Sequence, residues 1–81
     1  MPATSLRVRV ARDGEQVVQL TFAAAAVGHL QELVPAEMLD RVRAHGIDIR
    51  QVSERAIAEG YQPGELFVLD DGGRTVRVWL E

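Results

Sequence analysis

Several residue types that carry chemistry are missing from this sequence. It has no cysteine, which excludes disulfide bonds and thiolate chemistry. All nine basic residues are arginine, and there is neither lysine nor asparagine, a composition typical of a GC-rich bacterial genome. The two histidines, His29 and His45, are not spaced as metal ligands, and a zinc site needs three or four ligands. We therefore expect no metal site, no cofactor and no catalytic residue.

Long apolar runs and a strong net charge are also absent. The longest apolar runs, FAAAAV and LFVL, are far shorter than the about 20 residues of a membrane-spanning helix. The opening MPATSLR has no apolar region typical of a secretory signal. A net charge of −3 gives no general attraction to nucleic acid or to an anionic membrane. We expect one soluble, cytoplasmic domain, residues 1–81, that binds no nucleic acid and inserts into no membrane.

The two ends of the chain carry the same pattern. VRVARDGEQVVQLTF and LFVLDDGGRTVRVWL both alternate apolar and polar residues on either side of an Asp-Gly pair, the signature of a β-hairpin. Duplication and convergence explain this likeness about equally well. The pattern predicts that even-numbered side chains face the interior. They are Leu6, Val8, Val10, Val18, Leu20, Phe22, Leu66, Val68, Val76, Val78 and Leu80.

The turn residues predict the register of each hairpin. The first should have a tight Asp13-Gly14 turn followed by a one-residue bulge near Gln16–Val17. The second should have a three-residue loop, Asp71-Gly72-Gly73, with its last glycine in the left-handed conformation. Odd-numbered side chains then face outward, namely Arg7, Arg9, Gln19, Thr21, Phe67, Leu69, Arg77 and Trp79.

Residues 23–59, between the hairpins, are expected to be helical. AAAAVGHLQELV is rich in helix formers. Pro35 is placed either to begin a new turn or to kink the helix, and Gly46 ends this helical stretch. Asp48 and Gln51 fit the capping box of the next helix, which Gly60 ends. The side chains expected to face the core are Val27, Leu30, Leu33, Val34, Met38, Leu39, Val42, Ile49, Val52, Ala56 and Ile57.

This order of elements predicts an α+β fold. Two β-hairpins flank two or three helices, and the simplest arrangement is an antiparallel sheet with the helices on one face. The strand order stays open. So does the question whether the hairpins form one four-stranded sheet or pair with another chain.

The same anchors resemble a small ββααββ module of bacterial YvlB-like proteins, where it commonly follows a SHOCT-like helical segment. The matching residues are Leu6–Val10, Asp13-Gly14, Val18, Leu20, Gly46–Ile49, Gly60, Gly64, Leu66, Asp70–Gly72, Val76 and Val78. The chain runs TFAAAA where the family usually has a proline, and we expect it to correspond to the module without the SHOCT-like segment. The resemblance implies the same fold and a link to envelope stress, and it implies no catalytic residues.

The acidic residues fit structural roles better than chemical ones. Asp13, Asp70 and Asp71 lack the spaced oxygen ligands of a calcium loop and are typical turn residues. Helical carboxylates are spaced to pair with arginines, as in Glu37–Arg41, Arg50–Glu54 and Arg55–Glu59. No phosphate-binding loop, dinucleotide motif or nucleophile elbow is present. The sequence therefore predicts a protein that is not an enzyme.

The outer face of the second hairpin is the candidate functional surface. Apolar residues on the solvent side of a strand need cover from a loop, a helix or another subunit, and aromatic residues and arginine are enriched at interfaces. We therefore predict an interaction or scaffold module that self-associates as a dimer. The predicted interface residues are Phe67, Leu69, Arg77, Trp79 and Val17.

Two other functions remain open. A regulatory binding module would recognise a peptide by adding a strand to an exposed sheet edge, or a small ligand between helices and sheet. The third function is RNA binding, in which Arg7, Arg9 and Arg77 would form a basic stripe on the outer face of the sheet. Phe67 and Trp79 lie on the same face, and sheet-based RNA-binding proteins stack bases on such aromatic residues. The acidic net charge argues against nucleic-acid binding.

Overall fold

A computed structural model describes the whole chain, residues 1–81. The α+β class is confirmed, with two β-hairpins flanking short helices. In chain order the elements are β1 (Ser5–Arg12), β2 (Glu15–Ala23), the 3-10 helix η1 (Ala24–His29), α1 (Leu30–Leu33), α2 (Ala36–Ala44), α3 (Ile49–Ala58), β3 (Gly64–Asp71) and β4 (Arg74–Leu80). The longest helix, α3, has ten residues, and no helix could cross a bilayer.

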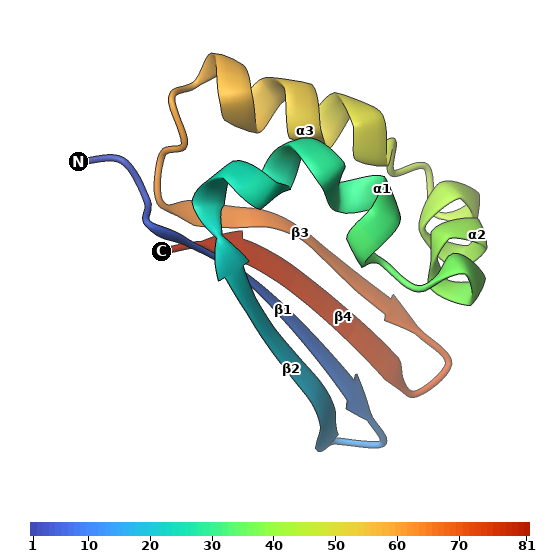
Figure 1. Cartoon of the computed structure of the whole chain (residues 1–81). Helices are drawn as coiled ribbons and strands as arrows, with labels where there is room; N and C mark the ends of the chain where they lie inside the picture. Colours follow the sequence, from blue (N-terminus) through green and yellow to red (C-terminus); the bar gives the residue numbers. More distant parts are fainter.

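The two hairpins join into one antiparallel sheet with the strand order β2-β1-β4-β3. The first and last strands therefore lie side by side in the centre of the sheet (Figure 1), where β1 pairs with β4 from Leu6↔Leu80 to Arg12↔Arg74. The helices lie against one face of this sheet and leave the turn end of the β1–β2 hairpin uncovered (Figure 1). The strand order leaves β2 and β3 as the two edges.

The core lies between the inner sides of the central strands and the helices. Sixteen buried apolar residues form one cluster, and Ser53 is the only buried polar residue. As predicted, even-numbered side chains of β1 and β4 supply the sheet side of this core. They are Leu6, Val8, Val76, Val78 and Leu80. Of the helical residues expected inside, Ile57 is instead 45% exposed.

Helix ends follow the local signals in the sequence. The side chain of Asp48 accepts a 3.2 Å hydrogen bond from the backbone N–H of Gln51, which confirms the N-cap of α3. Gly46 and Gly60 both have positive φ and end α2 and α3, because a left-handed residue lets the following N–H groups reach back to free carbonyls. Residues 24–29, expected in an α-helix, form a 3-10 helix, and Gly28 within them is a weak helix former.

The first hairpin has the predicted turn. Arg12 pairs with Glu15 across Asp13-Gly14, and both turn residues have positive φ, as a two-residue hairpin loop requires. The pairing steps from Ala11↔Gln16 to Val10↔Val18. Val17 is therefore the extra residue of a bulge, as the sequence predicted.

The second hairpin differs from the prediction. Asp71 pairs with Arg74, so the loop has two residues, Gly72 and Gly73, with φ of 58° and 87°. The predicted three-residue loop is wrong, because two consecutive glycines can both adopt positive φ and close the tighter turn. A two-residue loop pairs odd β3 residues with even β4 residues, as in Leu69↔Val76.

This register places two predicted interface residues in the core. Phe67 is 7% exposed and Leu69 is 2% exposed, both under the helices, so neither belongs to an outer face. Val68, expected inside, faces outward and is 42% exposed. A bulge at Leu66, between the pairs Glu65↔Trp79 and Phe67↔Val78, then shifts the register back. The prediction of even-inward side chains is therefore wrong for most of β3.

Candidate functional site: the free edge of β2

The outer face of the second hairpin is a polar, internally paired surface. Arg77 lies over the Trp79 ring, 4.8 Å from its centroid, and its Nε donates a 3.0 Å hydrogen bond to Glu65. Trp79 Nε1 donates a 2.8 Å hydrogen bond to Glu81. Without Phe67 and Leu69, the apolar residues of the second hairpin on this face are Val68 and Trp79, and such a partly polar face is typical of the solvated side of an antiparallel sheet.

The basic stripe on this face is also largely neutralised. Arg7 Nε lies 2.8 Å from Glu81 Oε1, an ion pair in which the N–H is not aligned for a hydrogen bond. Arg77 is paired with Glu65, and its guanidinium covers one face of Trp79, the aromatic ring on which a base would stack. This arrangement favours a solvated surface over an RNA-reading one.

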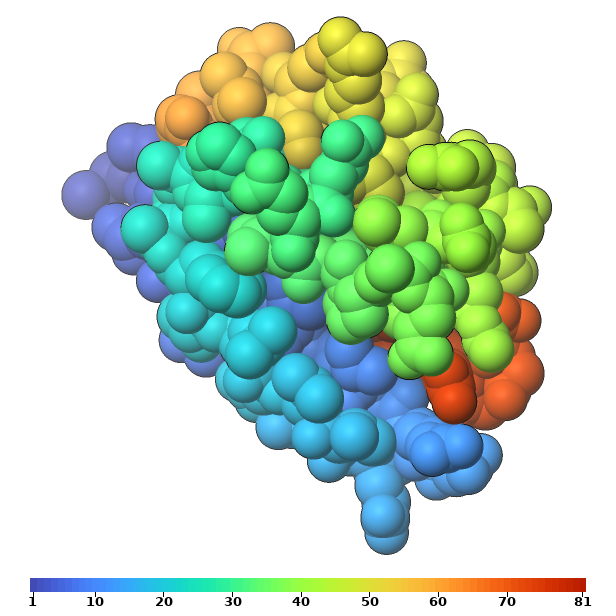
Figure 2. Space-filling view, turned by 45° about the vertical axis from the view of Figure 1, so that its right-hand side comes forward, coloured from blue at the N-terminus to red at the C-terminus, as the bar shows by residue number.

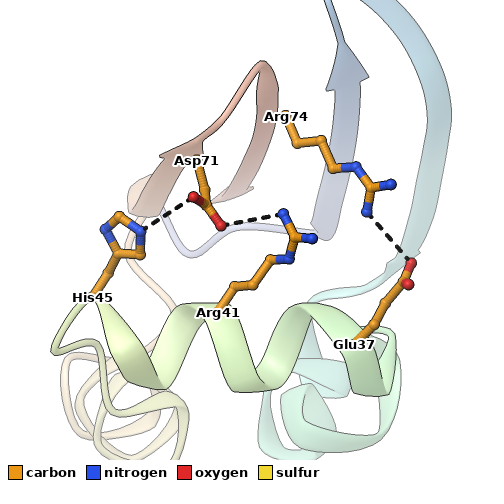
Figure 3. Close-up of polar contacts among 5 residues, drawn as sticks. All are labelled: Glu37, Arg41, His45, Asp71 and Arg74. Carbon is orange, nitrogen blue, oxygen red and sulfur yellow. Dashed lines mark hydrogen bonds and ion pairs between the residues drawn. The ribbon is translucent and has the colours of Figure 1, made fainter.

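A second polar cluster joins α2 to the β3–β4 turn (Figure 3). Asp71 Oδ2 accepts a 3.2 Å hydrogen bond from Arg41, and Asp71 Oδ1 lies 3.8 Å from His45 Nε2. Arg74 Nη1 lies 3.9 Å from Glu37 Oε1. The predicted Glu37–Arg41 pair is therefore replaced by contacts from each residue to the turn.

This cluster holds α2 against the turn, and its groups already have partners. The side chains of Arg41 and Asp71 are 41% and 33% exposed, so the pair contributes little to stability. The predicted pairs Arg50–Glu54 and Arg55–Glu59 do form on α3, at 3.3 and 4.0 Å. Nowhere do three or more His, Cys, Asp or Glu side chains lie close enough together to hold a metal ion.

The β2 edge presents free backbone hydrogen-bonding groups. Ser5 and Glu81 exchange both backbone hydrogen bonds, at 2.9 and 3.0 Å. Successive residues of a strand direct their N–H and C=O groups to opposite sides. The backbone groups of odd residues in β1 therefore point toward β4, and those of even residues point toward β2. Val8 pairs with Leu20, so Gln19 and Thr21 direct their N–H and C=O groups away from β1. These groups line the free edge.

An apolar row runs along the same strand on the helix-facing side. Val18 and Leu20 are 39% and 38% exposed, although they point to the side of the sheet that carries the helices. The helices do not extend over this part of the sheet, and in Figure 2 the blue and cyan atoms of the first hairpin project beyond the green atoms of the helices. The sequence predicted the direction of these side chains but not their exposure.

A shallow groove of about 220 Å³ borders this row. Its apolar lining comes from β1, β2 and the start of α2, and the charged residues Arg12, Glu37 and Arg74 also line it. The apolar lining residues are Val8, Val10, Val17, Val18, Leu20, Pro35 and Met38. Val17, a predicted interface residue, is 59% exposed and belongs to this surface, away from Arg77 and Trp79. The structure therefore does not bring the five predicted interface residues together.

The opposite edge, β3, carries features that discourage strand pairing. Its sequence GELFVLDD contains three carboxylates, and charges are a usual means of blocking an edge. Both edge strands carry a bulge, at Leu66 in β3 and at Val17 in β2. In β2 the segment Gln16–Ala23, QVVQLTFA, has no charged residue and no proline. The absence of charge is the sequence signal that could have singled out β2.

Comparison of the chain with protein-family models, with curated proteins and with solved structures found no match. The candidate site therefore rests on the geometry of the β2 edge.

Proposed function

We propose that the protein is a non-enzymatic interaction module that binds an extended polypeptide segment by adding it as a strand to β2. The observation that carries the proposal is an edge strand whose free N–H and C=O groups lie beside a half-exposed apolar row, with no charge in Gln16–Ala23. Strand addition draws affinity from main-chain hydrogen bonds and specificity from alternate side chains.

The position of the groove indicates which side chains of a bound segment the protein would recognise. Residues of an added strand that share the side of Val18 and Leu20 would lie on the side of the sheet that carries the groove. Residues on the other side would lie beside Gln19 and Thr21, which are polar and exposed. The ligand expected from this surface alternates apolar and polar side chains. The resemblance to the YvlB-like module stays a prediction, and the proposal does not depend on it.

A peptide titration tests this proposal. The probe is a synthetic peptide of the β2 sequence, EQVVQLTFA, flanked by lysines for solubility, and the control is a peptide of the same composition in scrambled order. We expect the alternating peptide to shift the backbone amide resonances of Gln19 and Thr21 in a two-dimensional NMR spectrum. The scrambled peptide should leave them in place.

Binding elsewhere would contradict the proposal. If the alternating peptide shifts the amides of β3 or the outer-face residues Arg77 and Trp79 while those of β2 stay unchanged, the docking edge is not β2. If neither peptide shifts any β2 amide at millimolar peptide, strand addition is rejected.

A further inference from the structure

We infer that the strand which β2 accepts is the β2 strand of a second copy of this chain, so that two four-stranded sheets join into one. The inference rests on the proposed function, because it uses the same edge. It goes further by naming the occupant, the register of the contact and the residue on the symmetry axis.

The side-chain pattern of β2 is complementary to itself in one register. In an antiparallel pair of identical strands, centring the two-fold axis on Leu20 sets Leu20 opposite Leu20 of the second copy and Val18 opposite its Phe22. The half-exposed Val18 and Leu20 then meet Leu20 and the partly buried Phe22 of the second copy. On the other side, Gln19 lies opposite Thr21 of the second copy, so polar residues meet polar residues.

The backbone is compatible with the same register. Gln19 and Thr21 carry the outward N–H and C=O groups. In this arrangement Gln19 of one copy and Thr21 of the other form a hydrogen-bonded pair. Leu20 directs its own groups toward Val8, which makes Leu20 and Leu20 of the second copy a non-hydrogen-bonded pair. Side chains approach most closely in such pairs, which suits two leucines on the axis.

The absence of charge in this segment favours a copy of the same chain as the partner. A two-fold axis brings each residue close to its own copy, so any charge near the axis would face a like charge and destabilise the pair. Gln16–Ala23 has none. Glu15 falls opposite Ala25 of the second copy in this register, beyond the end of the paired strand. The β3 edge, with Glu65, Asp70 and Asp71, would repel itself.

Cysteine cross-linking tests this contact directly, since the chain contains no cysteine. In a non-hydrogen-bonded antiparallel pair the two Cα atoms are about 4.5 Å apart, within the range of about 4.4–6.8 Å that a disulfide spans. We expect Leu20→Cys to form a disulfide-linked dimer on mild oxidation at micromolar concentration, with near-complete loss of the monomer band on non-reducing gels.

Two variants serve as matched controls. Val68→Cys lies on the other edge strand at nearly the same exposure, 42% against 38% for Leu20, and should form no disulfide-linked dimer. Gln19→Cys lies on β2 but off the axis, where the two sulfur-bearing residues are diagonal neighbours about 7–8 Å apart, and should cross-link poorly. Equal cross-linking of Leu20→Cys and Val68→Cys would overturn the inference. Equal cross-linking of Leu20→Cys and Gln19→Cys would overturn the register.

Sedimentation equilibrium of the unmodified chain provides an independent readout. We expect dimers that Leu20→Glu converts to monomers, whereas Val68→Glu, the same change on β3, leaves them intact. A monomeric unmodified chain at high micromolar concentration that still binds the β2-sequence peptide would overturn the second copy as occupant and leave the proposed function standing. A dimer that survives Leu20→Glu would place the contact on another surface and overturn the inference.

Discussion

At the scale of single residues, short-range signals predict structure reliably where all the interacting atoms lie within a few positions. Asp48 caps α3 through a bond to a residue three positions away, so sequence spacing alone finds it. Leu69 is different. Whether it is buried depends on the loop at Gly72-Gly73, which decides the face on which Phe67 and Leu69 lie. Its burial could not be derived from alternation alone.

Removing the cap of α3 tests the short-range signal. Asp48→Ala leaves an N–H at the start of α3 without a partner, and we expect a loss of about 1 kcal/mol in the free energy of unfolding. Urea denaturation followed by circular dichroism measures it. Asp40→Ala, the same change at an exposed position within α2, should cost nothing. Equal losses in the two variants would show that Asp48 does not act as a cap.

Truncating Leu69 tests the corrected register of β3. At 2% exposure, Leu69→Ala should lower the free energy of unfolding by about 2–5 kcal/mol through lost burial and the cavity left behind. Leu20→Ala, at 38% exposure, should cost less than about 1 kcal/mol in the monomer at low protein concentration. If Leu69→Ala costs as little stability as Leu20→Ala, the result would favour the three-residue loop and an outward-facing Leu69.

At the scale of elements, the hairpins and helices follow from periodicity and caps, and the register of one hairpin does not. Asp13-Gly14 offers one obvious turn, and its bulge was predictable because the apolar residues on both strands must share a face. Asp71-Gly72-Gly73 permits two loop lengths, since either glycine tolerates positive φ. Only the packing of Phe67 and Leu69 against the helices selects the shorter one. The exposure of β2 could not be predicted either, because it depends on how far the helices reach.

The second turn offers a prediction with opposite outcomes at neighbouring positions. Gly73 has a φ of 87°, and an added Cβ would lie 2.7 Å from Asp13 Oδ1, so Gly73→Ala should destabilise the fold by about 1–3 kcal/mol. Gly72→Asn should be neutral or stabilising, because Asn-Gly is the preferred pair in a two-residue hairpin loop. Thermal unfolding of both variants measures this. Equal effects of Gly73→Ala and Gly72→Asn would contradict this turn geometry.

At the scale of the whole molecule, the strand order decides where the chain can meet a partner. Placing both chain ends in the central strands leaves β2 and β3 at the edges. Three carboxylates lie on β3, whereas Gln16–Ala23 of β2 carries no charge. The proposed dimer therefore follows from topology together with the distribution of charge between two edge strands.

Self-association should make thermal stability depend on concentration. Because a partner that binds only the folded chain stabilises it by mass action, the Tm of the unmodified protein should rise with protein concentration. The Tm of Leu20→Glu should not. Differential scanning calorimetry over a wide range of concentrations measures both. A concentration-independent Tm for the unmodified chain would argue against the dimer.

The most direct measurement of the central claim is amide hydrogen exchange, residue by residue, at increasing protein concentration. In a dilute solution the amides of Gln19 and Thr21 should exchange rapidly, because they point away from β1. They should become protected as the concentration rises, whereas Val68 and Asp70, whose amides face the β3 edge by the same alternation, stay unprotected. Protection that appears at Val68 and Asp70, with Gln19 and Thr21 still exchanging freely at the highest concentration, would contradict the claim that β2 is the docking edge.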